Sequence, residues 1–177
     1  MGTDENHETV ATEPRWPVCE ICGSDRVVAD AWASWSREAN AWELQSTFDN
    51  TFCHACEFET TLEWRSTDVP RSERIRRQND ALRTGRRTNG QVMTTAGVAA
   101  NGNAFVVACR QAVAAFNAFS ADNDPYQEHD FGALNVDGER VFFKLDYFNP
   151  TLDGGSEDPA DPAITTRVLT IMLASEY

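Results

Sequence analysis

Hydrophobic and polar positions follow two different periods, before and after residue 66. In the first part apolar residues alternate with polar ones, as at Trp42, Leu44 and Phe48, which is the period of a half-buried strand. All five tryptophans lie in this part, where we expect them to supplement a small core. The pattern predicts strands at 27–35, 42–48 and 57–64, with a turn at 37–40 that joins the first two as a hairpin.

In the second part the pattern acquires a helical period in two places. Residues 72–84 form the first predicted helix, with Gly85 as its stop. A second helix is predicted over 104–119, where apolar residues recur three and four positions apart. Strands are predicted at 92–98, on both sides of an Asp137-Gly138 turn, and at 167–174, which is apolar on both faces and therefore central in its sheet.

The Asp137-Gly138 turn also sets a register for its hairpin. With these two residues at the centre of the turn, Phe131 lies opposite Lys144 and His129 lies opposite Asp146. Successive residues of a strand point to opposite faces. The face expected to lie toward the core consists of Leu134, Val136, Val141, Phe143 and Leu145.

Four of the five cysteines form two Cys-x-x-Cys pairs that flank the first hairpin, Cys19 with Cys22 and Cys53 with Cys56. This spacing lets one tight turn present two thiolates to an ion, and four thiolates close the tetrahedral shell of a structural Zn²⁺. Iron bound by the same ligands, as in rubredoxin, is the alternative. Residues 17–66 resemble the zinc-ribbon class, which implies a metal and a fold but no particular partner.

Two further residues bear on this site. His54 lies inside the second pair and could replace a thiolate, but with four thiols present we expect it to donate to a sulfur instead. Cys109 lies on the apolar stripe of the second helix, where a small buried hydrophobic residue is the favoured interpretation.

These elements predict an α+β protein, in which a small β unit is followed by a helix and a β-α-β-β-β unit with one helix packed on its sheet. The hydrophobic fraction of 41% is adequate for a core. The predicted organisation is a disordered acidic tail at 1–15, a zinc ribbon at 16–66, an arginine-rich helix and linker at 67–90 and an α+β domain at 91–177.

The formal net charge is −13, which favours solubility and repels nucleic acid. It is uneven, because residues 1–66 and 91–177 are strongly acidic whereas residues 67–90 carry a net +4. No apolar run approaches the length of a membrane span, residues 1–17 lack the features of a secretory signal, and the paired cysteines suit a reducing compartment. We therefore expect a cytoplasmic protein that contacts no membrane.

Seven arginines lie in the basic segment. Such a cluster is typical of a contact with nucleic acid or with a partner. We favour the alternative that the helix lies between two acidic neighbours and neutralises them, because both supply many carboxylates. The seven residues are Arg71, Arg74, Arg76, Arg77, Arg83, Arg86 and Arg87.

The segment that leads into the second hairpin is dense in groups that could carry chemistry. Carboxylates beside a histidine can bind a divalent ion or tune a general base, so a metal-dependent hydrolase or nuclease is one hypothesis. The favoured hypothesis is a polar turn capped by its own acids, with a lysine–aspartate pair on a solvated face. The candidate catalytic residues are Glu128, His129, Asp130, Lys144 and Asp146.

Several motifs in the second part resemble a bacterial family of small proteins with no assigned function. The resemblance extends over about residues 72–177 and implies a setting on plasmids and other mobile elements of alphaproteobacteria, but no activity. The motifs are NDPY at 123–126, EHDFG at 128–132, FKLDY at 143–147, SEDPADP at 156–162 and RVLTIMLA at 167–174.

Together these observations favour a non-enzymatic zinc protein that acts through protein contacts. The acidic surface and the plasmid-type setting favour a partner that handles nucleic acid. A sharper hypothesis is an acidic mimic that occupies such a partner's DNA site and inhibits host defence. The net charge disfavours direct binding of nucleic acid, and the oligomeric state is left open.

Overall fold

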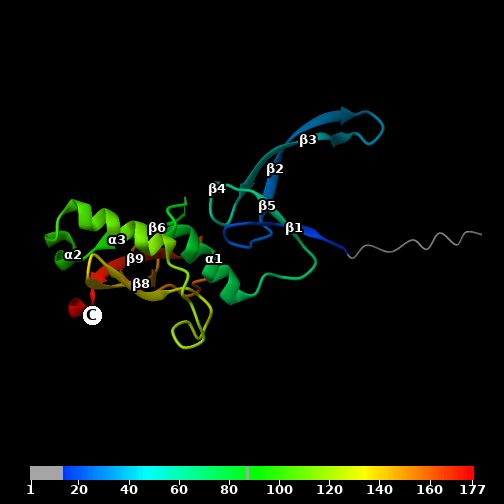
Figure 1. Cartoon of the computed structure of the whole chain (residues 1–177). Coiled ribbons are helices and arrows are strands. Elements are labelled where there is room, and N and C mark those ends of the chain that lie inside the picture. Colours follow the sequence, from blue (N-terminus) through cyan, green and yellow to red (C-terminus); the bar gives the residue numbers. More distant parts are fainter. Residues whose placement is uncertain (1–13, 87) are drawn as a thin grey trace, which may run out of the picture.

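The computed structural model describes residues 14–86 and 88–177. Two lobes lie on either side of helix α1 (Arg71–Arg83), and a long hairpin projects from the first lobe away from the rest of the molecule (Figure 1). Small sheets come first along the chain, and helices with a mixed four-stranded sheet follow. The α+β class predicted from the sequence is therefore confirmed.

The first lobe consists of two small antiparallel sheets. Its strands are β1 (Trp16–Cys19), β2 (Val27–Ser36), β3 (Ala41–Cys53), β4 (Phe58–Glu59) and β5 (Leu62–Arg65). The predicted hairpin is confirmed as β2 and β3, both longer than expected. The single strand predicted at 57–64 is wrong, because the chain leaves the sheet at Thr60 and Thr61; β4 pairs with β3 and β5 crosses to β1.

The second lobe is a sheet with helices on one face. Its elements are β6 (Gly90–Thr94), α2 (Ala96–Ala100), α3 (Asn103–Ala115), β7 (Phe131–Val136), β8 (Glu139–Phe148), β9 (Thr166–Leu173) and the 3-10 helix η1 (Ala174–Glu176). The strand order is β6-β9-β8-β7, with β6 and β9 parallel and the other pairs antiparallel. The predicted central place of the last strand is confirmed.

The predicted register of the second hairpin is also confirmed along β7 and β8, since Phe131 pairs with Lys144 and Leu134 with Val141. The face expected to lie toward the core is buried there: Val141 and Phe143 are fully buried. They lie in one cluster with Cys109 of α3, which confirms that Cys109 is a buried hydrophobic residue.

Two predicted boundaries in this lobe are wrong because a side chain from a distant part of the sequence sets each of them. The strand predicted at 92–98 ends at Thr94, and α2 follows. The carboxylate of Glu176 accepts hydrogen bonds from the Thr95 hydroxyl (2.6 Å) and from the backbone N–H of Gly97 (2.9 Å), so it caps the first turn of α2. A cap supplied from the far end of the chain leaves no local signal.

The helix predicted over 104–119 ends at Ala115, and Phe116 is extended with ψ of 130°. The guanidinium of Arg83 donates from Nη1 to the carbonyl oxygens of Val113 (2.6 Å) and Phe116 (2.8 Å). A basic side chain at these last carbonyls stabilises a helix end. The end of α3 is therefore set by a residue of α1.

Helix α1 is confirmed within one residue at each end, and Gly85 follows it with a left-handed φ of 77°. Leu82 belongs to the core of the second lobe, whereas Ala81 lies in the cluster around the cysteines of the first. Asn79, which lies two residues before Ala81, is also fully buried. The helix is thus packed on both sides and forms the connection between the lobes.

We predict that Gly132→Ala destabilises the second lobe. A Cβ at Gly132 would collide with the buried ring of Phe143 and lie 3.0 Å from Cε1 of Phe116. Overpacking of this kind typically costs about 1–3 kcal/mol of unfolding free energy, measurable by urea denaturation. The matched control is Gly154→Ala, whose Cβ would meet nothing closer than 3.4 Å and should change stability by less than about 0.5 kcal/mol. Equal effects of the two substitutions would contradict the packing argument.

Candidate metal centre and candidate binding surfaces

The two Cys-x-x-Cys turns have the same backbone conformation. The N–H of Gly23 donates to the carbonyl of Cys19, and that of Glu57 donates to the carbonyl of Cys53, each at 2.8 Å. Both residues adopt a left-handed φ, 68° at Gly23 and 57° at Glu57. This conformation is natural to glycine and costs another residue about 1 kcal/mol or more. The second turn is therefore held by its surroundings.

All four sulfur atoms are buried and lie within 4.8 Å of one another. The Sγ–Sγ distance is 3.8 Å between Cys19 and Cys56 and 3.6 Å between Cys22 and Cys53. A tetrahedral ion with Zn–S bonds of about 2.3 Å requires sulfurs roughly 3.8 Å apart, so these residues fit a closed four-thiolate zinc shell. Within residues 14–86 and 88–177 no other group of three or more Cys, His, Asp or Glu ligands is this close.

The four thiols also share hydrogen bonds. Those from Cys22, Cys53 and Cys56 lower the pKa of Cys19 far below that of a free thiol, and the Thr60 hydroxyl, 3.1 Å from the Cys19 sulfur, acts in the same direction. Hydrogen bonding to Cys19 raises the pKa of Cys56 instead. The cluster thus favours a thiolate at Cys19, and a bound divalent ion would stabilise the thiolate form of all four residues.

His54 lies outside the sulfur cluster. It is exposed, its ring centroid lies 5.4 Å from that of Phe52, and its backbone N–H donates to the carbonyl of Arg26. The cysteines alone make up the close group of ligands.

Three arginines of the basic segment, Arg74, Arg77 and Arg86, contact the first lobe. Arg77 forms an ion pair with Glu63 (2.7 Å) and a second one within α1. Hydrogen bonds from Arg77 and then Arg65 lower the pKa of Glu63 below its usual range. Arg74 donates to the carbonyl of Cys22 at 3.4 Å, and Arg86 pairs with a carboxylate of the same knuckle at 3.4 Å. These side chains connect the basic segment to the lobe that contains the two cysteine turns.

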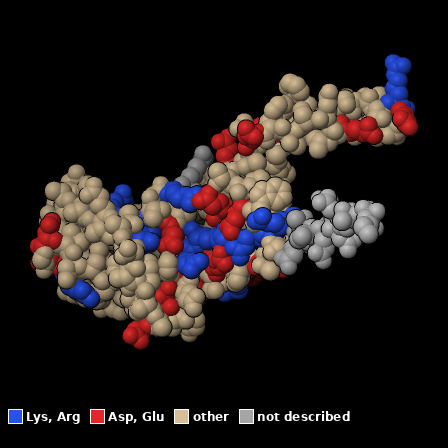
Figure 2. Space-filling view, turned by 45° about the vertical axis from the view of Figure 1, so that its right-hand side comes forward, with Lys and Arg blue, Asp and Glu red and all other residues tan. Residues whose placement is uncertain are grey.

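Two more arginines face the second lobe. Arg71 pairs with Asp158 at 3.1 Å, and Arg83 pairs with Asp80 while it caps α3. Basic and acidic side chains accordingly interleave over the middle of the face in Figure 2. Arg76 has no ion pair within the described part of the chain, and Arg87 lies outside it. This arrangement supports the interpretation that the basic segment neutralises its neighbours.

His129 does not lie opposite Asp146, so that prediction is wrong. It precedes β7 at a left-handed φ of 55°, which turns its ring toward α1. Its Nδ1 lies 3.0 Å from both carboxylate oxygens of Asp80, and its Nε2 lies 3.7 Å from Asp124. The ring stacks on Phe119 at 3.6 Å between centroids.

The other candidate catalytic residues stay near the hairpin. Lys144 and Asp146 form an ion pair of 2.7 Å on the sheet face away from the helices, with side chains about two-fifths exposed. Burial and then the neighbouring Asp130 raise the pKa of Glu128, and burial raises that of Asp130. His129 thus faces Asp80 and Asp124, whereas Lys144 pairs with Asp146, as in the favoured hypothesis of a lysine–aspartate pair on a solvated face.

Sequence reasoning missed a buried polar network between α1 and the second sheet. Arg167 of β9 is fully buried, and burial lowers its pKa to about 10. Its Nε–H donates to the Asn79 oxygen (3.1 Å), a second nitrogen donates to the carbonyl of Pro159, and the guanidinium lies 5.6 Å from the Tyr147 ring centroid. The Asn79 amide donates at 2.8 Å to Tyr147 and to the carbonyl of Glu128. The one sequence feature that could have indicated this network is Asn79, a polar residue between Ile75 and Leu82 on the apolar face of α1.

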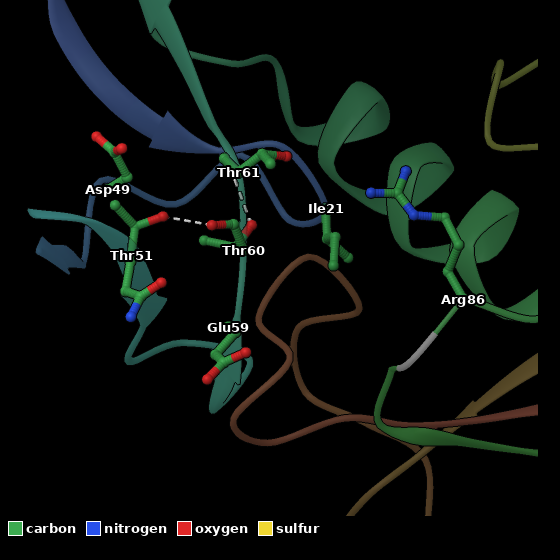
Figure 3. A pocket seen from close by; sticks show the side chains of 8 residues that line it. Ile21, Asp49, Thr51, Glu59, Thr60, Thr61 and Arg86 are labelled. Atoms are coloured by element: carbon green, nitrogen blue, oxygen red, sulfur yellow. Dashed lines mark hydrogen bonds between the residues drawn. The ribbon is translucent and has the colours of Figure 1, made fainter.

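An open polar cavity of about 480 Å³ lies between the base of the hairpin and the end of α1 (Figure 3). Threonine side chains form one wall and Arg86 approaches from the other side. The hydroxyl of Thr51 donates to the carbonyl of Thr60, that of Thr61 donates to Glu20, and Arg86 pairs with the same glutamate. Thr51, Thr61 and Arg86 are therefore already engaged in contacts within the chain.

The hairpin of β2 and β3, hereafter the arm, exposes large apolar side chains. Trp32, Trp42 and Leu44 are 66%, 70% and 68% exposed. Trp32 contacts Phe48 edge to face at 5.0 Å, and Trp35 contacts Trp42 in the same way at 5.7 Å. Figure 2 shows the arm standing clear of the body, with few charged groups along its middle. These tryptophans do not supplement a core, so that expectation is wrong.

Residues 94–176 match the model of a family described as a protein of unknown function (DUF3768). The match is shorter than the resemblance expected over 72–177, and α1 precedes it. No curated protein and no solved structure matches the chain. In the described part of the chain, none of the helices combines the length and apolar character required to cross a bilayer.

We predict one tightly bound Zn²⁺ per chain. Cys53→Ser should abolish this stoichiometric binding, because a tetrahedral shell then lacks a thiolate. The matched control Cys109→Ser removes a buried thiol in the other lobe and should retain one ion. Metal content by mass spectrometry after gel filtration measures both. Retention of the ion in Cys53→Ser, or purification with iron, would contradict the assignment.

The raised pKa values of Glu128 and Asp130 predict a pH-dependent stability difference. A carboxyl whose pKa is higher in the folded state disfavours folding once it ionises. The penalty is absent below the reference values of 4.5 and 3.8 and complete above the folded-state values. Glu128→Gln with Asp130→Asn should therefore gain unfolding free energy relative to wild type as the pH rises from about 4 to 7.

Urea denaturation across this pH range measures the difference between the two proteins. A difference between the double variant and wild type that does not change with pH would contradict the prediction.

Proposed function

We propose that this chain is a non-enzymatic, zinc-stabilised module for protein–protein contacts, and that the arm is its contact surface. The observation that carries the proposal is the exposure of Trp32, Trp35 and Trp42 on the part of the hairpin that projects from the first lobe. Contiguous exposed apolar surface marks interaction sites, and tryptophan is enriched among residues that dominate binding energy.

The zinc site supports this function by fixing the base of the arm. Cys53 is both a candidate metal ligand and the last residue of β3, where it pairs with Val27, the first residue of β2. A two-stranded hairpin alone is at best marginally stable in water. An ion bound to Cys53 would hold both strands where they enter the lobe.

The charge distribution favours a partner that handles nucleic acid. The net charge is −13, and five of the seven arginines of the basic segment contact groups within the chain. The remaining surface is acidic and complements a protein with a basic face. An accessory role on a mobile element, in which the chain occupies such a partner's DNA-binding surface, is the specific form of the proposal.

The arm should be required for capture of a protein partner. The full chain, immobilised and loaded with zinc, is exposed to a lysate of the source cells treated with nuclease. The variant Trp32→Ser/Trp35→Ser/Trp42→Ser should lose at least about tenfold of the captured partner, which is the scale of a lost hot spot. Quantitative mass spectrometry of the eluted proteins measures the loss.

Tyr126→Ser is the matched control, because Tyr126 is 76% exposed on the second lobe and lies outside the arm. Its captured proteins should equal those of wild type. Zinc content and thermal unfolding of the second lobe, measured on the triple variant, establish that the body remains folded. Capture that is equal with and without the tryptophans, or that depends on nucleic acid, would refute the proposal.

A further inference from the structure

Strand β2 forms an open edge along its whole length. The sheet order is β2-β3-β4, so β2 has a neighbour on one side only. Eight consecutive residues, 28–35, are exposed. The strand contains no proline, glycine or lysine, and its one charged residue is Asp30. Natural proteins protect edges with charged residues, proline, bulges or covering elements, and β2 has almost none of this protection.

The opposite edge of the arm differs. Both register shifts place the additional residues in β3, between Leu44 and Ser46 and between Thr47 and Thr51. Bulges twist a strand and disrupt pairing. β4 also covers β3 at Phe52 and Cys53. The regular edge of β2 is therefore the one suited to accept another strand.

Side chains flank this edge on both faces. Alternate residues of a strand point to opposite faces, so Trp32 and Trp35 lie on different faces of the arm. Each ring is supported by a partner from β3, Phe48 and Trp42 respectively. A strand added to β2 would gain backbone hydrogen bonds and contact one indole on each face.

The charge of the arm indicates which kind of strand fits. The arm contains one basic residue, Arg37, and four acidic residues. The acids are Asp30, Glu38, Glu43 and Asp49. A second copy of this chain would bring the same excess of negative charge to the edge, on a molecule with a net charge of −13. Like charges across an interface are unfavourable, whereas lysine and arginine beside these acids are favourable.

We infer that the β2 edge binds an extended, basic segment of a partner protein by strand addition. The segment carries apolar or aromatic side chains at alternating positions and lysine or arginine between them. Backbone pairing supplies affinity in such complexes, and alternate side chains supply specificity. The inference rests on the proposed function, since it names the chemistry and the binding mode of the partner at the arm.

The test uses a random peptide library displayed on phage and the zinc-loaded full chain. Selected peptides should combine basic and apolar residues, and their affinity should fall at least about tenfold on Trp32→Ser/Trp35→Ser but not on Tyr126→Ser. Affinity should also fall as the salt concentration rises from about 0.05 to about 0.5 M. N-methylation of the peptide backbone should weaken binding about tenfold at alternate residues and little at those between, the pattern of strand pairing.

A flat response to N-methylation, or selection of acidic peptides, would overturn the inference. The inference would also be overturned if no selected peptide bound wild type more tightly than the tryptophan variant. That result would leave the proposed function intact, because capture of a partner by the arm is measured separately. Sedimentation equilibrium tests whether a second copy of the chain binds at this edge. A monomer at all concentrations is expected, and a dimer that Trp32→Ser/Trp35→Ser dissociates would assign the edge to another copy of the chain.

Discussion

The burial of Arg167 against Asn79 is the interaction on which the arrangement of the two lobes depends. Removing a guanidinium from water costs several kcal/mol, and no carboxylate in the described chain pairs with this one. The side chain is held by the Asn79 oxygen, a carbonyl and the face of Tyr147. Since Asn79 belongs to α1, the second sheet is complete only when that helix is docked, although the matched family segment begins after it.

The same helix explains why five arginines of the basic segment are engaged within the molecule. An exposed ion pair contributes at most about 1 kcal/mol, so Arg71 and Arg86, whose pairs are about half exposed, add little individually to stability. The segment's effect is positional: Arg77 and Arg86 reach the cysteine lobe, and the buried Arg83 ends α3 in the other. A side chain that is paired within the molecule is not free to neutralise phosphate. The sign of a local charge cluster is therefore a weak guide to function until its partners are known.

Sequence patterns predicted the features that depend on residues close together in the chain. They failed for the features that are set by contacts with distant residues. The period of two in β8 and the Asp137-Gly138 turn were sufficient for the sheet register, and the cysteine spacing was sufficient for the ligand cluster. The ends of β6 and α3 depend on Glu176 and Arg83, which lie far away along the chain. His129 was misplaced because a left-handed residue before β7 breaks the alternation of faces on which the prediction relied.

The tryptophans show why an alternating pattern leaves burial undecided. Alternation predicts a strand with two unlike faces, and it is satisfied equally by a face that meets a core and by one that meets another molecule. Here the cysteine knuckles occupy the small core of the first lobe, and the arm extends beyond it. Cys53 joins the two, because its sulfur lies in the cluster and its backbone pairs with the start of β2. A metal ion held by the four cysteines would therefore act on the exposed edge from a distance. With Cys53 as a ligand, the base of the hairpin would lose freedom, and less entropy would remain to be lost on addition of the partner strand that we propose.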